Sequence, residues 1–147
     1  MDEIPESKKF INLGIVVNGK DEILMIRRAK VEKSGDDVLE WAFPGGKQRL
    51  NESRSECVRR KILARTGYDV DPVREISLRV HPRFLVMIAY HLCRLNSPKQ
   101  IVEPQEVHEI AEIRWVAPED VRTLITSDLD PKVAQEIDRL AKKRLQK

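Results

Sequence analysis

The sequence predicts an α/β fold in which a mixed β-sheet is sandwiched between α-helices. Three observations lead to this prediction: an apolar alternation before Asn18-Gly19 with an apolar run after it, a helical periodicity over residues 53–65, and later strand-like runs followed by two helices. Strands, a helix, further strands and terminal helices are the order expected of a sheet that is covered on both faces.

The N-terminal strands are expected to form a hairpin. Apolar residues alternate over 11–17, and a second apolar run covers 23–26. Asn18-Gly19 separates the two runs, and both residue types tolerate the positive φ angles that tight hairpin turns require. The charged segment 29–37 is then predicted to be a loop before a strand over 38–43.

A helix is expected from Ser53 to about Arg65, because apolar residues recur there at helical spacing. Ser53 and Glu56 have the spacing of a capping box, and Gly67 suits the left-handed residue that often follows a helix. The remaining elements are expected to be strands near 68–80, 84–95 and 110–116, a polar loop over 96–108, and helices over 118–125 and 131–145.

Composition and charge exclude several classes of protein. Of the 147 residues, 41% are hydrophobic and 35% are charged, which is typical of a folded domain rather than of a disordered chain. The apolar run 84–95 is too short to cross a bilayer, and a net charge of +3 does not indicate nucleic acid as a partner. We therefore expect one domain over residues 10–147 after a tail, 1–9, in the cytoplasm, with Cys57 and Cys93 as free thiols.

The segment from Gly46 to Gly67 has a residue spacing that is found in a known family. Five residues separate Gly46 from Glu52, and seven separate Glu52 from Arg60. This pattern resembles the box of the Nudix hydrolase family (MutT-like), and the likeness extends over about residues 10–125. The resemblance implies a Nudix-type fold and hydrolysis of nucleoside diphosphate-linked compounds with Mg²⁺ as cofactor.

The box departs from the family at the three positions where glutamates hold the metal. This chain has Lys61, Ala64 and Arg65 there. Residues three and four places apart project from one helical face, where positive charges oppose a cation. The opposition is about 4 kcal/mol per pair of unit charges at 4 Å and an effective dielectric constant of 20. We therefore expect no metal at this box, and a catalytically impaired protein.

Three other carboxylates are the candidates for catalysis if hydrolysis survives. Glu52 occupies the position of the family's first glutamate, whereas Glu106 and Glu109 precede the strand expected over 110–116. The resemblance allows a carboxylate from this later region to act as metal ligand or base. The alternative for Glu52 is a structural ion pair with Arg60.

The basic side chains of the same helix are candidates for ligand binding. Arg60, Lys61 and Arg65 would contact phosphate groups directly, in place of a metal; the alternative is a solvated charged face. Gly45-Gly46 would let the preceding loop approach a ligand closely. Trp41 either stacks on a base or packs in the core.

Three functions remain open on the sequence alone. The first is a catalytically impaired Nudix protein that binds a nucleotide or another phosphate-containing small molecule. The second is an active pyrophosphohydrolase of nucleoside diphosphate-linked compounds. The third is a non-catalytic interaction module, with the amphipathic helix 131–145 as the contact surface of a homodimer. Loops outside the box decide which ligand is bound.

Overall fold

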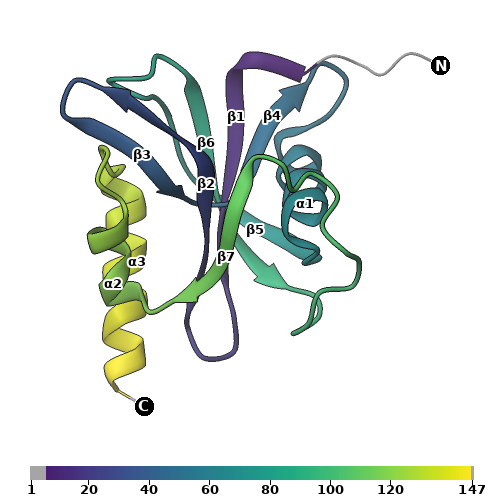
Figure 1. The fold of residues 1–147 in the computed structure, drawn as a ribbon. Coiled ribbons are helices and arrows are strands. Elements are labelled where there is room, and N and C mark those ends of the chain that lie inside the picture. Colours follow the sequence, from purple (N-terminus) through teal and green to yellow (C-terminus); the bar gives the residue numbers. More distant parts are fainter. Residues whose placement is uncertain (1–5, 147) are drawn as a thin grey trace.

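The computed structural model describes residues 6–146, which form a twisted sheet with helices on both sides (Figure 1). The strands are β1 (Glu6–Val17), β2 (Ile23–Ser34), β3 (Asp37–Ala42), β4 (Gly45–Arg49), β5 (Val70–Val80), β6 (Met87–Leu95) and β7 (Ile110–Val116). The helices are α1 (Arg54–Thr66), α2 (Pro118–Leu124) and α3 (Pro131–Leu145).

The sheet is mixed, because β1 runs parallel to β6 and antiparallel to β4. Its strand order is β3-β2-β1-β6-β5, with β4 added to β1 and β7 added to β2. Over their described residues, β1 and β2 are paired at Val17 and Ile23 alone, where the chain turns between them. The strands therefore diverge into one group around β1 and β6 and another around β2.

Helix α1 lies on one side of the strands, and α2 and α3 lie on the other (Figure 1). Two hydrophobic clusters reflect this arrangement, and the alternation of β1 supplies both. Ile15 packs in the cluster with Val133 and Ile137 of α3, whereas its neighbour Val16 packs in the cluster with Ile62 of α1. Each fully buried aliphatic side chain contributes about 1.5–3 kcal/mol. The prediction of a mixed sheet between helices is confirmed.

Both ends of α1 follow the signals in the sequence. The Ser53 hydroxyl accepts the Glu56 amide, and the Glu56 carboxylate accepts the Ser53 amide, so the capping box forms. Gly67 adopts the left-handed conformation with φ of 80° and donates its amide to the Leu63 carbonyl. A Cβ on Gly67 would lie 2.3 Å from the Val102 carbonyl oxygen. Both the left-handed conformation and this close contact therefore favour glycine at this position.

The first hairpin differs from the tight turn that was expected. The loop spans residues 18–22, and the positive φ of 58° falls on Asp21 rather than on Asn18 or Gly19. The Asn18 side chain instead accepts the amides of Lys20 and Glu22. Asn18 therefore organises the loop by side-chain hydrogen bonds, as asparagine commonly does in turns.

The charged segment 29–37 was wrongly predicted as a loop. Strand β2 continues to Ser34, a turn follows, and β3 begins at Asp37. Backbone pairing, for example between Glu32 and Leu39, holds β2 and β3 together. This charged segment therefore forms strands although its side chains are exposed. Strand β4 was also missed, because its two glycines suggested a loop.

Strand β1 begins at Glu6, within the segment that was expected to be a tail; residues 1–5 of that segment lie outside the described residues. The terminal helices begin at Pro118 and Pro131, and Asp130 caps α3 by accepting the amides of Lys132 and Val133. In residues 6–146 we find no helix long and apolar enough to span a bilayer.

Candidate functional site

The side chain of Lys61 is buried at the centre of the site, with 2% of it exposed. Its ammonium donates to both oxygens of Glu106, at 2.9 and 3.0 Å. The nearer oxygen of Glu6 lies 3.4 Å away. Lys61 is on α1, Glu106 on the loop before β7, and Glu6 at the start of β1, so one cation joins three separate segments.

Two glycines of β4 make room for this arrangement. A Cβ on Gly46 would lie 2.4 Å from Cε of Lys61, so the lysine side chain fills the space that a side chain at 46 would need. Gly45 has φ of 148°, and a Cβ there would lie 2.0 Å from the carbonyl oxygen of Asn12. Both glycines are therefore explained by close packing of β4 against its neighbours.

The other two box positions also face the loop before β7. Arg65 donates to Glu109 at 3.0 Å. The carbonyl oxygen of Ala64 accepts the amides of both Gln105 and Glu106, at 2.7 and 3.0 Å. The loop is therefore held on α1 by backbone hydrogen bonds as well as by ion pairs.

Glu52, just before α1, and Arg60, on α1, form a two-pronged ion pair with N–O distances of 2.9 and 2.7 Å. Arg60 also donates to Glu6, and Glu52 accepts the amide of Arg49. Burial alone would raise the pKa of Glu52, but hydrogen bonds from Arg60 and Arg49 outweigh it and hold this pKa below its usual value. Glu52 thus has the structural partner that was its alternative role.

A pocket of about 640 Å³ opens beside these ion pairs, between the two groups of strands. Its inner part is largely apolar and aromatic, and its rim is charged. The apolar lining includes Ile11, Leu13, Leu39, Phe43, Phe84, Val86, Ile88, Ile125 and Leu129. The charged and polar lining includes Arg28, Lys30, Glu32, Lys47, Arg65, His108, Glu109 and Asp128.

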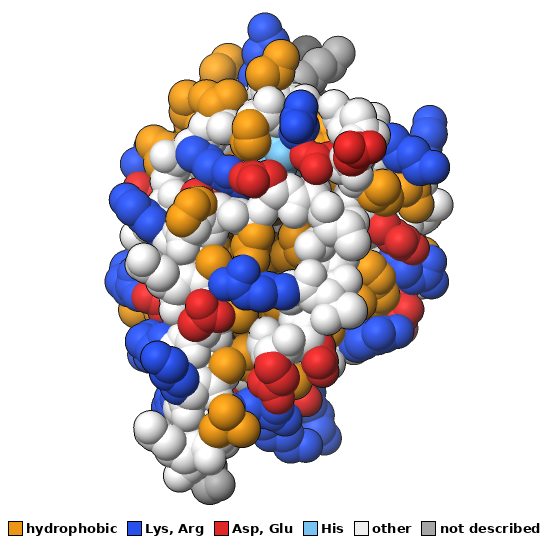
Figure 2. All heavy atoms as spheres, turned by 90° about the vertical axis from the view of Figure 1, so that its left-hand side faces the viewer, with side chains coloured by type: hydrophobic (Ala, Val, Ile, Leu, Met, Phe, Trp, Pro, Cys, Tyr) orange, Lys and Arg blue, Asp and Glu red, His pale blue; other side chains and the backbone are white. Residues whose placement is uncertain are grey.

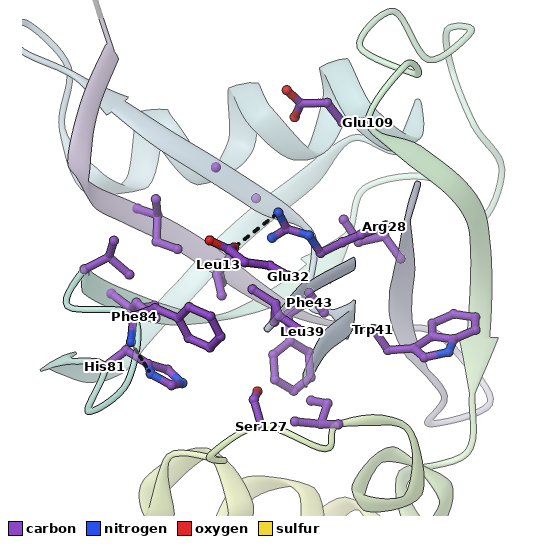
Figure 3. A pocket seen from close by; sticks show the side chains of 18 of the residues that line it. Leu13, Arg28, Glu32, Leu39, Trp41, Phe43, His81, Phe84, Glu109 and Ser127 are labelled. Atoms are coloured by element: carbon purple, nitrogen blue, oxygen red, sulfur yellow. Dashed lines mark hydrogen bonds and ion pairs between the residues drawn. The ribbon is translucent and has the colours of Figure 1, made fainter. Parts of the chain in front are cut away.

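Figures 2 and 3 show the character of the pocket and of its surroundings. On the face that carries α2, α3 and β3, hydrophobic side chains lie recessed between interspersed positive and negative side chains (Figure 2). Leu39, Phe43 and Phe84 gather on one side, and an ion pair of 3.5 Å joins Arg28 to Glu32 above them (Figure 3).

Trp41 stands at the edge of this pocket rather than at its centre. Its indole points away from Leu39 and Phe43 (Figure 3). The ring packs against the cluster on the α3 side of the sheet, and the Arg114 guanidinium lies 4.7 Å from its centroid. This cation–π contact occupies a face that a stacked base would need.

The structure brings together most of the residues selected from the sequence. Arg60, Lys61, Arg65, Glu106 and Glu109 meet around the C-terminal half of α1, but Lys61 does not line the pocket. Sequence reasoning missed several participants, among them Glu6, Arg28 and the pocket-lining rings of Phe43 and Phe84. Glu6 was assigned to a tail, and Arg28, at the end of an apolar strand, gave no signal of a position on the pocket rim.

The sequence model of the NUDIX domain family matches residues 9–139, which is most of the chain. The chain belongs to the Nudix family. This confirms the resemblance that the spacing from Gly46 to Gly67 indicated. The matched segment runs from β1 into α3 and so includes both halves of the sheet, α1 and the pocket.

Known Nudix relatives are similar at a distance. The mRNA-decapping protein g5R of African swine fever virus (isolate Pig/Kenya/KEN-50/1950) is 30% identical over 118 residues, which cover 71% of this chain and 46% of the relative. A putative nudix hydrolase 1 of Caenorhabditis elegans is 29% identical over 101 residues, covering 69% and 26%. The chain thus spans less than half of the length of either relative.

The solved structure of a MutT protein from Methanosarcina mazei Go1 has the same fold. It superposes with a TM-score of 0.61 and 20% identity, covering 92% of this chain and 94% of the other. The arrangement of the mixed sheet and its helices is therefore one that this MutT protein also has. At this identity the likeness concerns the fold.

The side chains of this Nudix domain do not fit Mg²⁺, the cofactor that the family implies. Mg²⁺ needs oxygen ligands in near-octahedral geometry. Here Lys61 holds Glu106, Arg65 holds Glu109, and Arg60 holds Glu52. Among residues 6–146, no three His, Cys, Asp or Glu side chains converge as a metal-binding group.

Proposed function

We propose that this Nudix domain binds a nucleotide or another phosphate-containing small molecule in its pocket without metal-assisted hydrolysis. One observation carries the proposal: each of the three candidate catalytic carboxylates is already paired with a lysine or arginine of the box helix. Glu52 is held by Arg60, Glu106 by Lys61 and Glu109 by Arg65. A divalent cation would have to displace these charges before it could bridge a diphosphate.

The pocket supports the binding half of the proposal. Phosphate groups suit its rim, where Arg28, Lys47 and Arg65 supply hydrogen-bond donors with positive charge. A planar base suits its inner part, where the rings of Phe43 and Phe84 lie. Because Arg65 lines the pocket and Lys61 does not, Arg65 is the box-helix residue that contacts phosphate in this proposal.

Thermal denaturation with and without Mg²⁺ tests both halves. The compounds are nucleoside diphosphates, inorganic pyrophosphate and, because one relative is named a decapping protein, an mRNA cap analogue. We expect at least one nucleotide to raise the melting temperature equally in Mg²⁺ and in chelator. A ligand at one hundred times its Kd stabilises the native state by about 2.7 kcal/mol.

Hydrolysis is measured on the same compounds by phosphate release. We expect no Mg²⁺-dependent turnover, and a rate of about 1 s⁻¹ or more on any of them would show an active pyrophosphohydrolase instead. If no compound binds and none is hydrolysed, the proposal fails and the non-catalytic interaction module is the hypothesis that remains.

A pair of arginine variants on α1 locates the bound ligand. Arg65→Ala removes a guanidinium that lines the pocket and should weaken binding about tenfold to hundredfold. Arg59→Ala is the matched control, because Arg59 is on the same helix but pairs with Asp69 away from the pocket. Equal effects of the two substitutions would place the ligand elsewhere.

A further inference from the structure

The ammonium of Lys61 is the buried centre of a charge cluster that crosses the fold. It contacts the carboxylates of Glu106 and Glu6, and Glu6 also accepts a hydrogen bond from Arg60. A buried ammonium is strongly unfavourable unless carboxylates compensate it, and two carboxylates in contact are equally unfavourable without a cation. The Lys61 ammonium and the carboxylates around it therefore stabilise each other.

The surroundings of Lys61 are shaped around this cation. Gly46 leaves open the space through which the lysine chain passes, and a Cβ there would overlap with it. The amides of Gln105 and Glu106 both reach the carbonyl oxygen of Ala64, one helical turn beyond Lys61. The space left by Gly46, the carboxylate of Glu106 and the backbone hydrogen bonds to Ala64 thus all help to position the Lys61 side chain.

We propose that Lys61 supplies, as part of the chain, the cation that completes this cluster, so that Glu6 and Glu106 are held on α1 without a metal. The cation that its family takes from solution is replaced here by a covalently attached one. This inference concerns the cluster rather than the pocket, and it holds whether or not the pocket binds a phosphate compound.

The proposal has a structural consequence for the pocket rim. Glu106 lies on the same loop as His108 and Glu109, two residues that line the pocket. Holding Glu106 on Lys61 therefore also fixes the position of the loop from which these side chains project. The same contact would be lost if a mutation removed the ammonium.

Removing the lysine tests whether the cluster requires a cation. In Lys61→Ala we expect the melting temperature to fall by roughly 6–15 °C, because Glu106 loses its nearest counter-ion and Glu6 is left with Arg60. Millimolar Mn²⁺ should then raise the melting temperature of this variant by several degrees and leave that of the wild type unchanged. Electron paramagnetic resonance should detect Mn²⁺ bound to the variant. Lys99 is exposed on the loop that carries Glu106, so Lys99→Ala is the control. Its melting temperature should match that of the wild type and should not rise with Mn²⁺.

A double variant shows which side chain binds Mn²⁺. Lys61→Ala with Glu106→Gln should bind no Mn²⁺, because the cluster then loses the carboxylate that contacts the ammonium most closely. Bound Mn²⁺ that ignores Glu106→Gln would place the metal elsewhere and overturn the proposal. A Lys61→Ala protein that is as stable as the wild type would overturn it as well.

A charge-compensation pair decides the case in which Lys61→Ala does not fold. Lys61→Met keeps most of the side-chain volume but removes the charge. Adding Glu106→Gln should raise the melting temperature of Lys61→Met, whereas in the wild-type background the same substitution should lower it. If Glu106→Gln lowers both, the lysine is not the counter-ion of Glu106 and the proposal fails.

Discussion

Gly46 and Lys61 are complementary in volume: a Cβ on Gly46 would lie 2.4 Å from Cε of Lys61 and 3.4 Å from its Cγ and Cδ. The glycine lies on β4 and the lysine on α1, so the fit joins the two elements of the box. The lysine chain is not free to move aside, because its ammonium is held by Glu106. The two positions are therefore energetically coupled.

Gly46→Ala should lower the free energy of unfolding by about 1–3 kcal/mol, because overpacking a buried position forces neighbours out of place. In a Lys61→Ala background the same change should cost much less, since the alanine at 61 leaves the space open. Denaturant titration of the four proteins measures the coupling. Additive effects would contradict the contact.

Replacing Lys61, Ala64 and Arg65 together by glutamate should create a divalent-cation site. Glu6, Glu106 and Glu109 lie beside these positions, so the variant would gather carboxylates from three segments. Without a cation the carboxylates repel one another, so the protein should be less stable in chelator and regain stability with Mg²⁺ or Mn²⁺. Melting temperatures that ignore both metals would show that the side chains do not converge.

Stability should fall as the pH is lowered from about 7 towards 5. Burial lowers the pKa of His91, and burial together with Arg79 lowers that of His81, from an ordinary value of 6.5. A histidine whose pKa is lowered by folding takes up its proton first in the unfolded state. Its contribution is complete above pH 6.5 and is lost as the pH falls through the folded pKa.

A second loss is expected below about pH 4.5, where carboxylates are protonated. Hydrogen bonds and charge from Lys61 and Arg60 outweigh burial at Glu6 and hold its pKa below 4.5, and Glu52 behaves likewise. Denaturation across this range measures both steps. His91→Gln should reduce the first, while His108→Gln, at an exposed residue, should not.

Both cysteines should be unreactive in the folded protein. Cys57 and Cys93 are free and buried, as the sequence predicted, and burial raises their pKa values to about 11 and about 12. A thiol-specific reagent at about pH 8 should therefore modify them only at the rate of unfolding. Lys99→Cys provides an exposed thiol for comparison and should react at once. Rapid modification of the native wild type would contradict the burial.

The parts of this fold that depend on local signals could be predicted from the sequence. The limits of α1 follow from Ser53, Glu56 and Gly67, which act within a few residues of the helix ends. The strand that contains Ile15 could be recognised because apolar residues alternate over 11–17, and the structure places these residues against one hydrophobic cluster. The signals for these elements lie within or next to the elements themselves, so no partner segment was needed to identify them.

The parts that depend on distant partners could not be predicted. Glu106 is 45 residues from Lys61, and Glu6 is 54 residues from Arg60, so nothing in the local sequence joins them. Strand β4 forms because β1 offers pairing partners, although Gly45 and Gly46 have low strand propensity. Glu106 and Glu109 could be selected as candidates, but not their pairing with Lys61 and Arg65.

The burial of Lys61 beside two carboxylates also limits which single substitutions the protein can tolerate at this site. Lys61→Glu alone would bring a third carboxylate to Glu6 and Glu106, at a cost of about 4 kcal/mol for each pair of like charges at 4 Å and an effective dielectric constant of 20. Ala64→Glu or Arg65→Glu alone would leave the ammonium in place. An acidic residue at position 61 therefore needs either a bound cation or a second substitution that removes one of these carboxylates.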